Sequence, residues 1–261
     1  MEMRLRDQVG LVTGGSSGIG RGISIELARE GASVVIADLQ ETPRRGKYET
    51  DPPTTTTVEE IEKLGTRGLF VRTDVSDEQS VRRMLQKTIQ RFAGIDIMVN
   101  NAAVLTPGNS QELSVEQWDR VLAVNLRSLF LTTKFAAPFL KQSKAGRIIN
   151  IASVAAFFGG GGPAYSAAKA AVVNLTRDSA LELAPYGVTV NAVCPGFVKT
   201  AMHDHFTEEK QKQLRQGTPL KRAGTPAEIG RTCVFLASDD GAWITGIALP
   251  VDGGWLARVH T

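Results

Sequence analysis

The segment Tyr165-Ser-Ala-Ala-Lys169, with Ser153 twelve residues upstream, contains the residue types of a carbonyl and alcohol redox site. If the chain after Pro163 is helical, Tyr165 and Lys169 project from one face, one turn apart. A phenol with a pKa near ~10 is a poor proton shuttle at neutrality unless a nearby cation favours the phenolate. Lowering the phenol pKa by about 3 units takes roughly 4 kcal/mol, which Lys169 and a cationic nicotinamide could supply together.

Ser153 follows the apolar run Arg147-Ile-Ile-Asn-Ile-Ala152. It is therefore predicted to lie at the carboxyl end of a strand, where open α/β sheets bind their ligands, and its hydroxyl is expected to hold the substrate oxygen. By itself, the spacing of a tyrosine and a lysine on a helix is also typical of an ordinary surface pair. The rest of the chain has to decide between these two interpretations.

A glycine turn near the start of the chain supports a nucleotide site. The predicted strand Val9–Thr13 is followed by Gly14-Gly-Ser-Ser-Gly18-Ile-Gly20 and by a helical pattern through Glu30. Glycines let the backbone approach a diphosphate closely, and the amino terminus of the helix presents free N–H groups and a positive dipole end. This order of elements predicts a dinucleotide-binding turn rather than a flexible loop.

The next predicted strand, Ser33–Ala37, is followed by Asp38, eighteen residues beyond Gly20. Dinucleotide folds place an acid near this position, where it binds the adenosine ribose hydroxyls. A 2′-phosphate would be repelled by that carboxylate, and Ser17 offers no positive charge to offset the repulsion. The pattern therefore favours NAD as the cofactor over NADP.

Together these residues resemble the short-chain dehydrogenase/reductase family in its form of roughly 250 residues, and the resemblance covers nearly the whole chain of 261 residues. It implies a catalytic set of Asn125, Ser153, Tyr165 and Lys169, in which Asn125 supports a water-linked proton relay through Lys169. It also implies a homotetramer, assembled through the long helices and the carboxyl-terminal strand near Ile247–Val251. The cofactor contacts that it implies are Gly14, Ser16, Ser17, Gly18, Ile19, Gly20, Asp38, Asp74, Val75, Asn101, Ala102, Tyr165, Lys169, Pro195, Gly196, Val198 and Thr200.

The chain departs from the family pattern in two places. In Asn100-Asn-Ala-Ala103, an alanine stands where the family usually has glycine, which could narrow the pocket. Residues 40–57 form an insert of about ten residues, rich in proline and threonine, which predicts an irregular surface loop. The insert either folds over the bound nucleotide, with Arg44 or Tyr48 as contacts, or is a solvated excursion. Its cations Arg44, Arg45 and Lys47 could also reach a 2′-phosphate and offset Asp38.

Strand and helix signals alternate along the chain and predict a single α/β Rossmann domain over residues 1–261, a doubly wound parallel sheet of seven strands with helices on both faces. Helix starts are predicted at three capping boxes, Ser76 with Gln79, Ser114 with Gln117 and Thr225 with Glu228. A long helical stretch is predicted over Val115–Lys141. The strands are predicted at Val9–Thr13, Ser33–Ala37, Gly68–Arg72, Ile95–Val99, Arg147–Ile151, Val188–Cys194 and Ile247–Val251.

Composition excludes several functional classes. The net charge of +3 is spread along the chain without a long basic run, which argues against nucleic-acid binding. The amino terminus lacks the apolar core of a secretory signal, and no apolar run approaches the length of a membrane span. Cys194 and Cys233 lie in apolar runs and are expected to be buried free thiols. These features predict a cytoplasmic protein that does not bind membranes.

The predicted substrate pocket is lined by Ala103–Thr106, Val154–Gly162 and a lid over residues 197–220, since these segments follow central strands. Two histidines in the lid, His203 and His205, lack further ligands at metal-binding spacing, so no metal is expected. The sequence predicts an NAD-dependent dehydrogenase for a small-molecule secondary alcohol, with a sugar or another polyol as one candidate, yielding a ketone or lactone. The alternatives are an NADPH-dependent reductase of a 3-oxoacyl thioester or similar ketone and a non-catalytic NAD-sensing scaffold.

Overall fold

A computed structural model describes residues 3–47 and 53–258, and within these ranges seven strands form one parallel sheet. The sheet has the order β3-β2-β1-β4-β5-β6-β7. This confirms the predicted Rossmann-like α/β fold. The strands are β1 Val9–Thr13, β2 Ser33–Asp38, β3 Gly68–Arg72, β4 Ile97–Asn100, β5 Arg147–Ile151, β6 Thr189–Pro195 and β7 Ala248–Val251.

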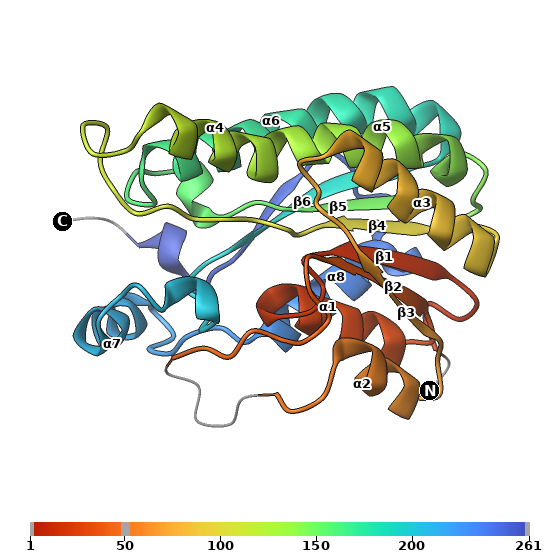
Figure 1. Ribbon diagram of the computed structural model, residues 1–261, viewed down its shortest axis with the longest axis horizontal. Coiled ribbons are helices and arrows are strands. Elements are labelled where there is room, and N and C mark those ends of the chain that lie inside the picture. The colour runs from red at the N-terminus through yellow and green to blue at the C-terminus, as the bar shows by residue number, and fades with distance from the viewer. Residues whose placement is uncertain (1–2, 48–52, 259–261) are drawn as a thin grey trace.

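Helices cover both faces of the sheet because successive strand residues point in opposite directions. Val12 and Ile36 face one core with α1, α2 and α8, whereas Leu11 and Val35 face the other core with α3, α5 and α6. Figure 1 shows the two helical layers on either side of the strands. The helices are α1 Gly18–Arg29, α2 Thr57–Lys63, α3 Glu78–Phe92, α4 Val115–Leu122, α5 Ser128–Leu140, α6 Pro163–Leu183, α7 Glu208–Gly217 and α8 Pro226–Ala237.

The strand order reverses between β1 and β4. From β1 the chain builds outward through β2 and β3, and from β4 it builds in the opposite direction through β7. Ligands of open parallel sheets bind outside the carboxyl ends of the strands at such a reversal. The glycine turn after β1 and the segments after β4 and β5 meet there, so the topology brings the predicted site residues to one edge of the sheet (Figure 1).

Two local predictions need correction. The helix α3 is capped by Asp77 instead of Ser76, since the Asp77 carboxylate accepts from Gln79 N and Ser80 N, while Ser76 Oγ donates to Asp74 at 2.6 Å. Strand β4 begins two residues later than predicted, at Ile97. The other strand limits differ from the prediction by at most one residue, and the capping boxes at Ser114 and Thr225 are confirmed.

The long helical stretch predicted over Val115–Lys141 is interrupted by a π-helical turn, Ala123–Arg127, between α4 and α5. Such turns contain one residue more than an α-helical turn and often mark functional sites. This one contains Asn125. None of the helices between residues 3 and 258, the unplaced stretch 48–52 aside, has the length and apolar character needed to cross a bilayer.

Candidate active site

The candidate catalytic triplet, Ser153, Tyr165 and Lys169, lies where β5 and α6 meet. Pro163 occupies the first turn of α6, where its missing N–H is tolerated, and the helix carries Tyr165 and Lys169 on one face. Ser153 follows β5, and its hydroxyl is hydrogen-bonded to the phenol of Tyr165. The Lys169 ammonium lies 5.6 Å from the centroid of the Tyr165 ring and donates to the carbonyl of Ile151 at 2.7 Å. The structure thus brings the three predicted side chains together.

Burial dominates the electrostatics of this triplet. Lys169 is only 2% exposed, and desolvation lowers the pKa of its ammonium to about 8. The pKa of Tyr165 is raised, because burial disfavours the phenolate more than the hydrogen bond from Ser153 favours it. The lowering expected from Lys169 together with a bound cationic nicotinamide stays a prediction.

Asn125 holds the segment after β4 in place. Its side-chain Nδ2 donates to the Val104 carbonyl and its Oδ1 accepts from Val104 N, both at 2.8 Å. Asn125 is fully buried, so both of its polar atoms are satisfied by this one residue. The contact fixes the backbone that leads from Ala102 into the predicted substrate pocket. The proton relay through Lys169 stays a prediction. Both polar side-chain atoms of Asn125 form hydrogen bonds with Val104.

A buried chain of hydrogen bonds behind the site, which sequence reasoning missed, connects the sheet to the helices. Asn100 on β4 donates to Asn150 on β5 at 2.8 Å, and Asn150 donates to Thr176 on α6 at 2.9 Å. Thr132 on α5 donates to Asn100 Oδ1 at 2.6 Å. Buried polar groups are costly unless paired, so this chain specifies how α5 and α6 sit on the sheet. The only sequence signal was a polar residue inside each of two apolar strands.

The glycine turn is fixed by close packing. A Cβ on Gly20 would lie 2.1 Å from the carbonyl oxygen of Gly14, and Gly14 itself has φ +65°. Asn101 closes the turn from the side, because its Nδ2 donates to the carbonyls of Thr13 at 2.9 Å and Gly14 at 3.1 Å. Any side chain at position 20 would therefore open the turn. The predicted contacts Asn101 and Ala102 lie directly against it.

The turn fits the diphosphate and ribose of a dinucleotide. The hydroxyl of Ser16 is buried and has no hydrogen-bond partner among the described residues. The first turn of α1 carries no acidic residue that would repel an anion. Asp38 Oδ2 accepts from Ser16 N at 3.1 Å, so the carboxylate lies beside the turn as predicted. Thr200 lies on the far side, within 3.2 Å of where a Cβ on Gly18 would be.

The remaining predicted cofactor contacts surround the same edge of the sheet. Val75 is buried, while Asp74 is exposed and accepts from Ser76 N at 2.9 Å. Pro195 ends β6, and Val198 forms an isolated parallel bridge with Gly224. Ile19 packs against the core beneath the turn. The contacts of these residues with a cofactor stay predictions.

The segment after β5 and the carboxyl-terminal turn form a wall on the substrate side. A Cβ on Gly161 would lie 3.0 Å from Cδ1 of Tyr165, so this glycine lets the backbone pass next to the phenol. Phe158 is stacked on Trp255, with ring centroids 6.5 Å apart. Trp255 also lies against Gly217, at the end of the lid helix α7. Sequence reasoning missed Trp255, since it lies ninety residues from Tyr165 and carries no local signal.

The lid histidines do not form a metal site. The His203 ring packs against Phe197 at 5.1 Å and Phe206 at 5.7 Å between centroids, and burial lowers its pKa. His205 is exposed, and its Nδ1 is 3.0 Å from the carbonyl oxygen of Met202. Within residues 3–47 and 53–258 no group of three or more His, Cys, Asp and Glu side chains could hold a metal ion.

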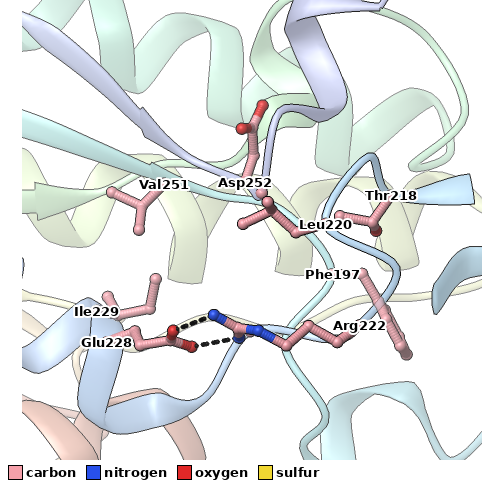
Figure 2. A pocket seen from close by; sticks show the side chains of 10 residues that line it. Phe197, Thr218, Leu220, Arg222, Glu228, Ile229, Val251 and Asp252 are labelled. Atoms are coloured by element: carbon pink, nitrogen blue, oxygen red, sulfur yellow. Dashed lines mark hydrogen bonds and ion pairs between the residues drawn. The ribbon is translucent and has the colours of Figure 1, made fainter.

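A cavity of about 150 Å³ lies between the predicted lid and the end of β7. Figure 2 shows it between Leu220 of the lid and Val251 at the end of β7, with the Arg222–Glu228 ion pair at its rim. Arg222 Nη2 lies 2.6 Å from Glu228 Oε1, and this contact lowers the pKa of Glu228 to about 2. None of the four predicted catalytic residues lines this cavity. Its lining includes Phe197, Thr218 and Leu220 of the predicted lid.

Comparison with known proteins places the chain among oxidoreductases. A family model described as enoyl-(acyl carrier protein) reductase matches residues 14–256. The chain is 38% identical over 260 residues to the 2,5-dichloro-2,5-cyclohexadiene-1,4-diol dehydrogenase LinX of Sphingobium indicum, covering 99% of this chain and 100% of that protein. It is 34% identical over 253 residues to the 3-oxoacyl-(acyl-carrier-protein) reductase FabG of Thermotoga maritima, covering 97% and 99%.

Among solved structures, the fold matches that of a candidate short-chain alcohol dehydrogenase from Sinorhizobium meliloti 1021 with a TM-score of 0.89. That match has 31% identity and covers 99% of this chain and 100% of the other. The relatives by sequence span the whole length of this chain, one named as a dehydrogenase of a cyclic diol and one as a reductase of a 3-oxoacyl thioester.

Proposed function

Because the chain belongs to the short-chain dehydrogenase/reductase family, we propose that it is an NAD-dependent oxidoreductase that interconverts a secondary alcohol with its ketone or lactone. The observation that carries this proposal is the contact of the half-buried Ser153 and Tyr165 side chains, with the buried ammonium of Lys169 beside the same ring. The triplet lies on the same edge of the sheet as the glycine turn, so a nucleotide and an alcohol could be held side by side.

The proposed mechanism assigns one task to each residue of the triplet. When bound, the nicotinamide cofactor supplies the hydride acceptor for oxidation or the hydride donor for reduction. Ser153 holds the reacting oxygen next to Tyr165, which takes the hydroxyl proton in oxidation and returns it to the carbonyl oxygen in reduction. Lys169 favours the phenolate form during the transfer, since its positive charge lies against the ring. The Asn125 contact with Val104 keeps the adjoining backbone in position.

We propose a secondary alcohol on a ring, such as a sugar or another cyclic polyol, as the substrate class. Support comes from the likeness to LinX, whose name gives a cyclohexadienediol, and from the Phe158–Trp255 wall, which offers apolar surface to a ring face. The alternative is NADPH-dependent reduction of a 3-oxoacyl thioester, which the likeness to FabG favours. A non-catalytic NAD-sensing scaffold would have no need of the Ser153–Tyr165 contact.

The proposal is tested by a panel of cyclic alcohols, sugars, hydroxy acids and steroids, with their ketones, each offered with NAD and with NADP. Nicotinamide absorbance reports turnover. We expect oxidation of cyclic secondary alcohols with NAD. Preferential reduction of 3-oxoacyl thioesters with NADPH would support the alternative reductase, and nucleotide binding without any turnover across the panel would support the scaffold.

Replacing Asp38 with alanine is expected to change the cofactor preference. The Asp38 carboxylate is the acid beside the turn, and hydrogen bonds from a ligand to a charged group contribute about 1.5–3 kcal/mol. We therefore expect Kd for NADH to rise by roughly 10- to 100-fold, while Kd for NADPH falls because the repulsion of the 2′-phosphate disappears. Fluorescence titrations with both nucleotides measure this, with Glu62→Ala, at an exposed glutamate on α2, as the control. An unchanged ratio of the two Kd values would contradict the NAD assignment.

We also propose a homotetramer located in the cytoplasm. The buried thiols Cys194 and Cys233 suit a reducing compartment. Trp243, between α8 and the edge strand β7, is 100% exposed, and large exposed apolar groups often mark contacts with other chains. Trp243→Glu is expected to convert tetramers to smaller species, as seen by sedimentation velocity. Leu220→Glu, at an exposed lid residue, is the control and should leave the assembly intact.

A further inference from the structure

Both ends of the insert 40–57 are attached to the glycine turn. Near its start, the main-chain N–H of Arg44 donates to Ser17 Oγ at 2.7 Å. At its end, Thr57 Oγ1 lies 3.0 Å from the carbonyl oxygen of Gly15 and 3.3 Å from that of Ser16, so its hydroxyl donates to the turn. These two attachments hold the flanks of the insert against the start of α1. The flanks are therefore packed on the protein and are not a solvated loop.

Two further contacts strengthen the attachment. The guanidinium of Arg21 on α1 donates to Thr55 at 3.3 Å and to Thr57 at 3.2 Å. Pro43, one residue before the first attachment, is buried although its neighbours on both sides are exposed. Residues 40–47 and 53–57 are described, and the predicted nucleotide contact Tyr48 lies outside the described residues. The described flanks are therefore packed on the protein.

A third attachment joins the insert to the lid. The main-chain N–H of Lys47 donates to Asp204 Oδ1 at 3.0 Å, although the two residues are 157 positions apart. Figure 1 shows the insert leaving the carboxyl end of β2, running along the amino terminus of α1 and reaching the region of α7. The described part of the insert thus extends from Asp38, the predicted ligand of the ribose, past Ser17 to Asp204 in the predicted lid.

The insert carries two arginines at the point where it contacts Ser17. Arg44 and Arg45 are exposed, and neither forms an ion pair with an acidic side chain in the described part of the chain. Arg44 makes the attachment to Ser17 through its main chain, and Arg45 follows it. Ser17 is preceded by Ser16, whose buried hydroxyl has no hydrogen-bond partner among the described residues. Guanidinium groups bind phosphate oxygens with charge-assisted hydrogen bonds, so cations at this position suit a phosphate-bearing ligand.

We propose that the insert forms a third wall of the cofactor site, in which Arg44 and Arg45 contact the phosphates of the nucleotide and Asp204 fastens this wall to the lid. The inference rests on the proposed function, because it takes a nicotinamide nucleotide to be the ligand of the glycine turn. The phosphate could be the diphosphate, which NAD and NADP share, or the 2′-phosphate of NADP. In either case the arginines are binding residues that lie outside the family pattern.

The first test measures Kd for NADH and for NADPH by fluorescence with the double variant Arg44→Ala/Arg45→Ala. Arg120→Ala, at an exposed arginine on α4, is the matched control. We expect Kd to rise about 5- to 20-fold in the double variant and to stay constant in the control. An equal loss for both nucleotides indicates the diphosphate, and a larger loss for NADPH indicates the 2′-phosphate. Unchanged Kd values in the double variant would overturn the arginine contacts.

The second test addresses the link to the lid through the rate of NADH release in a stopped-flow displacement. Asp204→Ala removes the acceptor for Lys47 N, whereas Asp204→Asn keeps an oxygen in the same place. We expect release about 3- to 10-fold faster in the alanine variant and unchanged in the asparagine variant. Equal rates in all three proteins, or equal acceleration in both variants, would overturn the hydrogen-bonded link. If the unmodified protein binds neither nucleotide, the proposed function itself fails.

Discussion

Tyr165→Phe is expected to lower kcat by about 10²- to 10⁴-fold while leaving Kd for NADH nearly unchanged, because general acid–base catalysis typically contributes a factor of that size. The substitution removes only the phenolic oxygen that exchanges a proton with the substrate. Ser153 loses its hydrogen bond with the phenol but still accepts from Ala155 N at 3.1 Å, and the ring, α6 and the neighbouring Lys169 keep their packing. Steady-state turnover and fluorescence titration on the same preparation measure the two quantities.

Folding has to be separated from chemistry in this variant. Loss of one hydrogen bond in a buried site changes stability by about 1 kcal/mol, so the melting temperature of Tyr165→Phe should stay close to that of the parent. Tyr186→Phe, at a half-exposed tyrosine far from Ser153, provides the matched control and should retain full activity. Turnover by Tyr165→Phe within tenfold of the parent would refute its role as the acid and base.

Lys169→Met is expected to lower kcat by about 10²- to 10³-fold, the range found when one electrostatic contact to a developing charge is removed. Methionine has a similar length and is apolar, so the buried space stays filled while the charge and the hydrogen bond to Ile151 disappear. We expect the free energy of unfolding of Lys169→Met to be higher than that of the parent, although its kcat is lower. Burial lowers the pKa of Lys169 to about 8 from 10.5, which costs about 3 kcal/mol at neutral pH.

The pH dependence of unfolding distinguishes this role from simple packing. Between pH 8 and 10.5 the unfolded lysine binds more protons than the folded one, so the contribution of Lys169 to stability rises with pH across this window. Burial also raises the pKa of Cys194 from 9.0 to about 11. The contribution of this thiol to the free energy of unfolding therefore falls as the pH rises above 9.0. The comparison with Lys169→Met isolates the lysine. A constant difference in unfolding free energy between the two proteins over this range would contradict a buried, perturbed ammonium.

Several features of the fold and the site were readable from the sequence because their signals are local. A strand of apolar residues, a glycine turn and a helix each depend on neighbours a few positions away, and β1 was predicted with its correct limits. The helix α1 begins at Gly18, inside the predicted turn Gly14 to Gly20. The catalytic pair was equally local, since helical periodicity alone puts Tyr165 and Lys169 on one face. A strand differs from its predicted limits where the apolar run extends beyond the residues that pair with the neighbouring strand. The start of β4 at Ile97 is an example.

Other features depend on which distant segments pack together. Asn125 was identified from its match to the family pattern, but only the fold showed that its side chain is hydrogen-bonded to the main chain of Val104. Desolvation of Tyr165, which raises its pKa, also emerged only from the fold, because a motif shows which charges are near but not how much solvent the surroundings remove.

The sequence by itself determined the class of the fold and the oxidoreductase family and named the residues of the candidate site, since periodicity and residue type encode these within short windows. Tertiary structure decided how strongly the site is desolvated, which groups complete its hydrogen bonds and where the insert lies. The contact of Lys47 with Asp204 joins segments that share no local signal. Such contacts follow from the packing of the whole sheet, in which each element is placed by all the others.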